Sequence, residues 1–245
     1  PVTYNGSFVV NPVNDAPVIK VAGVDQSARL IQEAVPQQDP GRSATEVRNI
    51  AAFAAIKDDG TVVSWGNPSF GGSNFNQKNV RSVTSNSIAF AAILEDGRIT
   101  SWGSGSYGYG YPQAGGSEPK AVKISSTDLA FAAIREDGSV TTWGHSSDSG
   151  ANSNAVADQL NEGVVKVFSS AKVFAALKID GSVVTWGEAS SGGDSSAVSQ
   201  QIKSGVVDLS SNDYAFTAIK SGGSVVAWGD QGNGGNISSV NYDLQ

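Results

Sequence analysis

The chain has 245 residues, a formal net charge of −7, a single histidine and no cysteine. The acidic charge argues against a surface that binds nucleic acid or an anionic membrane, and the missing cysteines exclude disulfides and thiolate catalysis. One histidine cannot build a multi-histidine metal site, and 29 glycines favour a loop-rich β protein. The sequence contains no apolar run long enough to insert directly into a membrane.

Residues 1–46 are predicted to form an extended arm, because they contain no copy of the repeat that fills the rest of the chain. A strand is expected at Ser7, Phe8, Val9 and Val10, and a helical turn is expected around residues 28–34. The strand could close the repeat domain or be donated to a neighbouring subunit.

An Asn-Asp-Ala-Pro sequence at residues 14–17 follows the predicted strand. It resembles the junction between tandem immunoglobulin-like or cadherin-like domains of bacterial surface proteins, which implies an extracellular or cell-surface location. In such linkers, side-chain oxygens can bind calcium, which would nominate Asn11, Asn14 and Asp15. A plain Asx/Pro turn is the alternative, and no other cofactor is expected.

Residues 47–245 are predicted to form one domain of five repeats. Each of the five tryptophans is followed by glycine, and a phenylalanine stands twelve residues before each. The spacing between tryptophans varies from 37 residues (Trp65 to Trp102) to 43 (Trp143 to Trp186), so a fixed unit alternates with connectors of variable length. We expect these aromatic residues to be the repeat core: Phe53, Trp65, Phe90, Trp102, Phe131, Trp143, Phe174, Trp186, Phe216 and Trp228.

The fixed unit is predicted to be a β-hairpin. In the fourth copy an apolar run meets Asp180-Gly181, and a β-branched run then ends at Trp186; Asp-Gly between two such runs is a strong hairpin signal. We therefore interpret the aspartates of these turns as structural rather than catalytic acids.

A third strand is expected before each of the last four hairpins, where short apolar stretches stand: residues 80–83, 121–124, 164–167 and 206–209. Each repeat is then at least a three-stranded antiparallel meander. Both faces of the meander carry apolar residues, so each sheet must stack between similar neighbours.

The connectors after each Trp-Gly are rich in glycine and serine. The third connector has Val156, Leu160 and Gly163 at helical spacing, and the fourth has Val198, Ile202 and Gly205 in the same pattern, so a short helix is expected in each. The first two connectors carry aromatic residues that could contact a ligand or partner, or simply cover the sheet edge; they are Phe70, Phe75, Tyr107, Tyr109 and Tyr111.

An apolar strand, Asp-Gly, a β-branched strand and Trp-Gly together resemble the repeat of the regulator of chromosome condensation superfamily, over about residues 47–240. The short form of the repeat resembles that of the bacterial β-lactamase inhibitory proteins, and the connectors resemble those of long arrays in marine microbes and algae. The resemblance implies a β-propeller whose blades are the meanders. Family members usually have seven blades, so five repeats could form a ring, an open or differently wound stack, or blades completed by other chains.

No pattern of residues indicates catalysis. His145 lies near serines and an aspartate, but the other copies carry different polar residues at its place, which favours a turn residue over a catalytic triad. The resemblance does not carry the family's nucleotide-exchange or enzyme-inhibiting activity to this chain, because it lies in scaffold residues.

The sequence therefore predicts an all-β fold: a propeller-like stack of five blades of three to four strands, with short helical connectors and the N-terminal arm. The expected function is that of a non-enzymatic extracellular structural or adhesive protein that self-associates as a homo-oligomer or polymer, or that anchors a fibre, layer or adhesin. The alternative is a monomeric binding module whose connectors recognise a protein or glycan.

Overall fold

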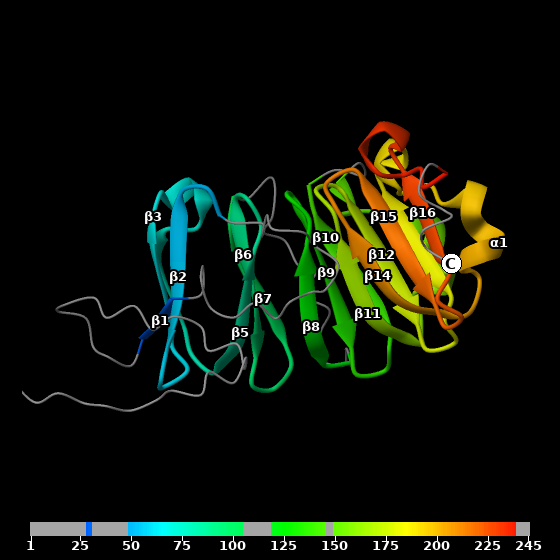
Figure 1. Cartoon of the computed structure of the whole chain (residues 1–245). Helices are drawn as coiled ribbons and strands as arrows, with labels where there is room; N and C mark the ends of the chain where they lie inside the picture. Colours follow the sequence, from blue (N-terminus) through cyan, green and yellow to red (C-terminus); the bar gives the residue numbers. More distant parts are fainter. Residues whose placement is uncertain (1–27, 31–48, 105–118, 146–148, 239–245) are drawn as a thin grey trace, which may run out of the picture.

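The structure is a computed structural model that describes residues 28–30, 49–104, 119–145 and 149–238. It is built almost entirely of short antiparallel strands, which group into five sheets that we call blades 1 to 5 in chain order (Figure 1). The expected all-β, five-bladed fold is confirmed. The predicted strand at residues 7–10 and the calcium ligands proposed at residues 11, 14 and 15 lie outside the described residues.

Each blade is a meander in which the strand that contains the repeat phenylalanine is central. These central strands are β2 (Ala52–Lys57), β6 (Ala89–Leu94), β9 (Ala130–Arg135), β12 (Val173–Lys178) and β15 (Ala215–Lys220). The strands that end in Trp-Gly are β3 (Val62–Gly66), β7 (Ile99–Gly103), β10 (Val140–Gly144), β13 (Val183–Gly187) and β16 (Val225–Gly229). Antiparallel pairing places each phenylalanine directly opposite its tryptophan.

The third strand of blades 2 to 5 pairs with the other edge of the central strand. These strands are β5 (Val80–Ser85), β8 (Ala121–Ser126), β11 (Val164–Ser169) and β14 (Val206–Ser211). Each register shifts after its first pair, which is a β-bulge at the second residue. The bulge turns Val122, Val165 and Val207 outward, and these valines are exposed.

Blade 1 differs from the others because it has four strands. β1 (Ala28–Leu30) pairs with β2 at the edge that the third strand occupies elsewhere, and β4 (Ser73–Gln77) pairs with β3. The helical turn predicted around residues 28–34 is therefore wrong at residues 28–30. Pairing with the edge of β2 satisfies the backbone of this segment and overrides its weak helical pattern.

The blades pack face to face through alternating side chains of the central strand. In β12, Phe174 and Ala176 face blade 3, whereas Val173, Ala175 and Leu177 face blade 5. Four apolar clusters of this kind join blades 1 and 2, 2 and 3, 3 and 4, and 4 and 5. The alanines of the repeat are small enough to let neighbouring sheets approach closely.

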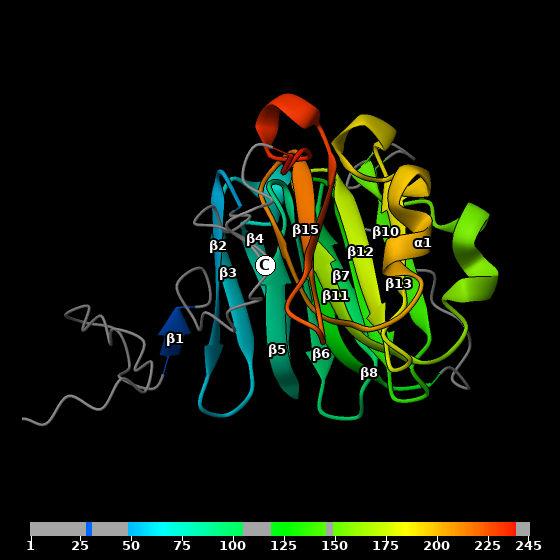
Figure 2. The same ribbon diagram turned by 45° about the vertical axis from the view of Figure 1, so that its right-hand side comes forward.

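The five blades follow one another along an open arc, with blade 1 at one end and blade 5 at the other (Figures 1 and 2). Among the described residues, no apolar cluster joins blade 5 to blade 1. Of the three arrangements that five repeats allow, the described part of the chain forms the open stack.

Short helical segments occur in the connectors, as expected. The third connector contains a 3-10 helix, η3 (Asn154–Gln159). The fourth contains η4 (Ala189–Ser191), then η5 (Ser196–Val198), which runs directly into α1 (Ser199–Ile202). The first and fifth connectors contain single 3-10 turns, η1 (Pro68–Phe70) and η6 (Gln231–Asn233). The predicted apolar positions Leu160 and Ile202 are buried against blades 4 and 5.

Candidate functional site

The surface with the clearest functional geometry is the contact between successive blades, and it begins with the paired aromatic side chains. In every blade the repeat phenylalanine and tryptophan stack, with ring centroids 5.2 to 5.6 Å apart. We call this unit the Phe–Trp pair. It forms because the two residues are directly opposite in antiparallel strands and point to the same face of the sheet.

The Phe–Trp pair of one blade is received by a glycine in the connector of the preceding blade. Gly192 has φ 103°, and a Cβ atom there would lie 3.0 Å from Cδ2 of Phe216. A side chain would thus collide with the pair and would also have to adopt a left-handed backbone. We call this connector glycine, together with its carbonyl group, the glycine cradle; the described cradles are Gly71, Gly150, Gly192 and Gly234.

The indole N–H group fixes the pair to the cradle in the blades where this hydrogen bond forms. Trp228 Nε1 donates to the carbonyl oxygen of Gly192 at 3.1 Å, and Trp186 Nε1 donates to that of Gly150 at 3.0 Å. Trp102 differs, since Phe75 stacks on its ring at 4.1 Å and its N–H has no partner among the described residues. In blades 4 and 5 a buried hydrogen bond between uncharged groups therefore specifies how the blade docks on the preceding one.

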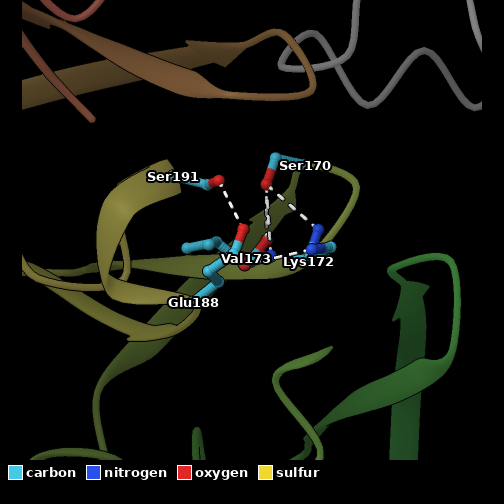
Figure 3. Close-up of polar contacts among 5 residues, drawn as sticks. All are labelled: Ser170, Lys172, Val173, Glu188 and Ser191. Atoms are coloured by element: carbon cyan, nitrogen blue, oxygen red, sulfur yellow. Dashed lines mark hydrogen bonds and ion pairs between the residues drawn. The ribbon is translucent and has the colours of Figure 1, made fainter. Parts of the chain in front are cut away.

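The cradle is held by its own blade. In blade 4 the carboxylate of Glu188 accepts hydrogen bonds from the hydroxyl of Ser191 and from Lys172 Nζ, at 2.7 and 3.0 Å (Figure 3). These two partners, the hydroxyl foremost, lower the pKa of Glu188 below its usual value. In the same view Ser170 Oγ accepts the backbone N–H of Val173 at 3.1 Å, which closes the turn that leads into β12.

The two ends of the stack differ from the interior. Phe53 and Trp65 are each 43% exposed, whereas the corresponding phenylalanines and tryptophans of blades 2 to 5 are 0 to 6% exposed. At the other end Ile219 is 44% exposed, although its counterparts Ile93, Ile134 and Leu177 are 1 to 6% exposed. We call these surfaces the N-terminal face, which bears Phe53 and Trp65, and the C-terminal face, which bears Ile219 and the Gly234 cradle.

The connector aromatics predicted as contact residues lie at internal positions where the structure describes them. Phe75 in β4 stacks on Trp102, and Phe70 packs half-buried against the cluster between blades 1 and 2. A contact of either residue with an outside partner stays a prediction. Tyr107, Tyr109 and Tyr111 lie outside the described residues.

The aspartates of the hairpin turns hold backbone geometry. In each turn the carboxylate accepts the N–H group two residues ahead at 2.9 to 3.0 Å; the residues are Asp59, Asp96, Asp137 and Asp180. The hydrogen bonds that each aspartate accepts from the residue two positions ahead lower the pKa of its carboxyl group. Within the described ranges, no group of three or more His, Asp or Glu side chains is placed to hold a metal ion.

His145 lies at the start of the third connector, where its backbone N–H donates to the carbonyl oxygen of Leu129 at 2.9 Å. The residues at the same place in the other blades make the same strand-closing bond; they are Asn67, Ser104, Glu188 and Asp230. A polar residue at this position thus begins a connector.

Comparison with known proteins identifies the architecture. No protein-family model matches the chain, and no curated protein matches it. Among solved structures, Prp20p of Saccharomyces cerevisiae is 14% identical over 75% of this chain and 56% of its own, with a TM-score of 0.50. The chain has the fold of a β-propeller repeat protein.

Two further solved structures resemble this propeller. Yeast RCC1 (Prp20) in its complex with Kap60 is 14% identical, with a TM-score of 0.50 over 75% of this chain and 55% of its own. The CRINKLY WD40 ectodomain of the Arabidopsis thaliana receptor kinase ACR4 is 20% identical, with a TM-score of 0.46 over 73% of this chain and 60% of its own. The chain therefore spans between half and two thirds of the length of these propellers.

The sequence predicted the aromatic residues of the docking surface but missed its glycines. The signal was present: Trp-Gly is followed, after four residues, by Gly-Gly in the first, fourth and fifth copies. The sequence analysis treated the glycine-rich connectors as segments of variable length, and only the three-dimensional contact shows that Gly71, Gly150 and Gly192 each receive the next blade.

Proposed function

We propose that this chain is a non-enzymatic structural module that associates with copies of itself to build or anchor a surface assembly such as a fibre, layer or adhesin. One observation carries the proposal. The Phe–Trp pair, which buries itself against a neighbouring blade in blades 2 to 5, is 43% exposed at both residues in blade 1. A paired aromatic surface of this kind is typical of protein interaction sites.

The neighbouring structures support an interaction module of some kind. The Prp20p structure is reported with binding to Gsp1p and histones, and the yeast RCC1 structure is a complex with Kap60. Those proteins bind protein partners, and we propose the same class of partner here. The acidic charge of −7 makes a protein surface a better partner than nucleic acid.

An extracellular or cell-surface location is part of the proposal. Its support is the Asn-Asp-Ala-Pro sequence at residues 14–17, which resembles linkers of bacterial surface proteins, together with a chain that contains no cysteine. In the described part of the chain, no helix has the length and apolar character needed to cross a membrane.

Sedimentation velocity of the full chain, from micromolar to near-millimolar concentration, tests self-association. We expect species heavier than the 25.1 kDa monomer that grow with concentration, and we expect Phe53→Thr/Trp65→Thr to remain monomeric. Threonine suits a strand, so blade 1 should still form. Val122→Thr/Val165→Thr, on exposed strand positions of the interior blades 3 and 4, is the matched control. A wild-type chain that is monomeric throughout would overturn the proposal.

Strand donation by residues 7–10 stays a prediction with a separate readout. If the arm supplies a strand to a neighbouring subunit, deletion of residues 1–20 should abolish association, even though Phe53 and Trp65 are retained. If association depends on the blade faces, the deletion should leave the oligomer mass unchanged.

A monomeric binding module is the second candidate, and a groove between the third and fourth connectors favours it. The groove has a volume of about 430 Å³ and is lined by residues of both connectors and of β13; they include Val156, Gln159, Thr185, Ser196, Ile202 and Lys203. A peptide or glycan could lie there. A strictly monomeric wild-type chain that binds a partner, with binding lost in Ser196→Lys on the exposed lining of the groove, would favour this function.

A further inference from the structure

We infer that the two end faces of this molecule bind each other, so that copies stack head to tail with the Phe–Trp pair of one copy on the Gly234 cradle of the next. The inference rests on the proposed self-association and names its contact. It defines the occupant of the N-terminal face as the C-terminal face of a second copy of this chain.

The internal contacts provide the template. Where blade 5 docks on blade 4, Phe216 and Trp228 meet Gly192, and the indole donates to its carbonyl oxygen at 3.1 Å. Where blade 4 docks on blade 3, Trp186 donates in the same way to Gly150. Two contacts within one chain thus show that a Phe–Trp pair of this protein docks on a glycine cradle.

The C-terminal face carries a cradle built to the same geometry. Gly234 has φ 103° and ψ −1°, against 103° and 5° for Gly192, and each follows a single 3-10 turn. A Cβ at Gly192 would contact the next Phe–Trp pair, whereas among the described residues one at Gly234 would meet only Asn212 of its own blade. The fifth cradle therefore has the shape of the occupied ones without a pair resting on it.

Side-chain hydrogen bonds fix this cradle from within its own blade. Asn212 Nδ2 donates to the carbonyl oxygen of Asn233, just before the cradle glycine, at 2.8 Å. Asn49 makes the same bond to Phe70 in blade 1, and Thr127 makes it to Ser149 in blade 3. The Gly234 cradle is thus preorganised in the same way as two cradles that receive a Phe–Trp pair, which lowers the entropic cost of docking.

The rest of the C-terminal face is compatible with a docked blade. Ser210 in β14 aligns with Thr84 and Ser125, whose hydroxyls donate to backbone carbonyls of the following blade at internal contacts. Ile219 aligns with residues buried at those contacts. Thr217 in β15 differs from the internal contacts, because the other four blades have alanine at this position. Because the threonine side chain is larger and more polar than alanine, we expect the contact between copies to be weaker than the contacts between blades, and therefore reversible.

The resulting contact has a direction. Because the two faces are different and complementary, each copy uses one face for each neighbour, which makes the interface heterologous. Such contacts generate an open filament, or a ring if the rotation between copies closes. A symmetric dimer through two N-terminal faces would leave every Gly234 cradle empty.

Two end-blocked variants of the full chain separate these arrangements. The N-blocked variant is Phe53→Thr/Trp65→Thr, and the C-blocked variant is Ile219→Lys/Gly234→Asn. Asparagine fills the cradle but accepts a positive φ more readily than other side chains. Ile179→Lys/Gly222→Asn is the matched control, since Ile179 is 81% exposed on a hairpin turn and a Cβ at Gly222 meets nothing within 4 Å. Thermal unfolding of each variant confirms that it folds.

Sedimentation velocity of the variants, alone and mixed, provides the test. We expect each blocked variant alone to remain at 25.1 kDa, and an equimolar mixture to give a dimer and nothing larger, because one intact N-terminal face then meets one intact C-terminal face. Each block should weaken association at least about tenfold, as loss of an aromatic anchor does. The control should associate like the wild type.

The failures are distinguishable. If the C-blocked variant associates like the wild type, the N-terminal face binds something other than the Gly234 cradle, and the inference is wrong while self-association stands. If the mixture stays monomeric although the wild type associates, the head-to-tail contact is likewise excluded. A wild-type chain that never associates would remove both the inference and the proposed function.

Discussion

At the scale of single residues, the same aromatic pair has two environments in one molecule. Trp186 is buried and its indole N–H donates to Gly150, whereas Trp65 is 43% exposed. A buried carbonyl group that loses its donor costs about 1–3 kcal/mol, but an exposed indole is solvated in either case. The location of a repeat in the stack therefore decides what its tryptophan contributes to stability.

Substitution of tryptophan by phenylalanine tests this difference. We expect Trp186→Phe to lower the free energy of unfolding by about 2–4 kcal/mol, from the lost hydrogen bond and the smaller buried area. Trp65→Phe should change it by less than about 1 kcal/mol at concentrations where the chain is monomeric. Urea unfolding measures both, and equal losses at the two sites would contradict the docking geometry.

The cradle glycines give a second prediction at this scale. Gly192→Ala places a Cβ 3.0 Å from Phe216 at a φ of 103°, so we expect a loss of about 1–3 kcal/mol. Gly222→Ala, in open space on a hairpin turn, should stay within about 0.5 kcal/mol. If urea unfolding shows the two variants to be equally stable, Gly192 is not required by the contact.

At the scale of elements, the hairpins depend on short side chains that bond to the backbone. The turn aspartates accept the N–H group two residues ahead. Before each central strand another short side chain accepts the N–H group three residues ahead; these residues are Asn49, Asn86, Thr127, Ser170 and Asn212. The glycine after each tryptophan is also required, since a Cβ at Gly229 would lie 2.6 Å from the carbonyl oxygen of Tyr214. Local chemistry thus fixes each meander before the blades pack.

The lowered pKa values of the turn aspartates predict an acid-sensitive fold. A carboxyl group whose pKa is lower in the folded than in the unfolded chain stabilises the fold above its unfolded value, here about 3.8, and loses this contribution as the pH falls through its folded pKa. We expect the free energy of unfolding to decrease below about pH 4.

Replacement of the four turn aspartates by asparagine should flatten that decrease, because the amide oxygen can still accept the N–H group but does not titrate. The variant joins Asp59→Asn, Asp96→Asn, Asp137→Asn and Asp180→Asn. Urea unfolding at pH 7, 5 and 3 measures the effect, with Asp158→Asn on exposed η3 as a charge control. An acid response identical to that of the wild type would show that other groups cause it.

The elements were largely predictable because each has a local cause. Asp-Gly turns, apolar runs of strand length and the Phe-to-Trp offset predicted the hairpins, and the third strands begin at Val80, Ala121, Val164 and Val206, the predicted positions. The strand at Ala28–Leu30 was not predicted, since its pairing partner Ala55 to Lys57 is distant in sequence. The cradle was missed for the same reason: its partner lies in the next blade.

At the scale of the whole molecule, the stack is a one-dimensional array: in the described part of the chain, each apolar cluster joins a blade to its direct neighbour in the sequence. The outer faces of the first and last blades of such an array lack the neighbouring blade that covers the same face in the interior. Here one end has a Phe–Trp pair that is 43% exposed at both residues, and at the other end no Phe–Trp pair of the described residues rests on Gly234, so both halves of the internal contact are present on one chain.

Net charge adds a prediction for this association. Each copy carries a formal charge of −7, so long-range repulsion opposes stacking, while the end faces named here are mainly apolar. Salt screens the repulsion and leaves the apolar contact intact. We expect light scattering to show a higher average mass in high salt than in low salt; a mass that falls with added salt would indicate a contact made through ion pairs.

The indole N–H signal of Trp65 in NMR spectra of the full chain tests the central claim most directly, and comparison with Trp65→Phe assigns it. On dilution, we expect this signal to change from a hydrogen-bonded to a solvent-exposed position, while the signals of Trp186 and Trp228, which are bonded within the chain, stay fixed. A Trp65 signal that remains exposed at every concentration, or protected at every dilution, would contradict association through this face.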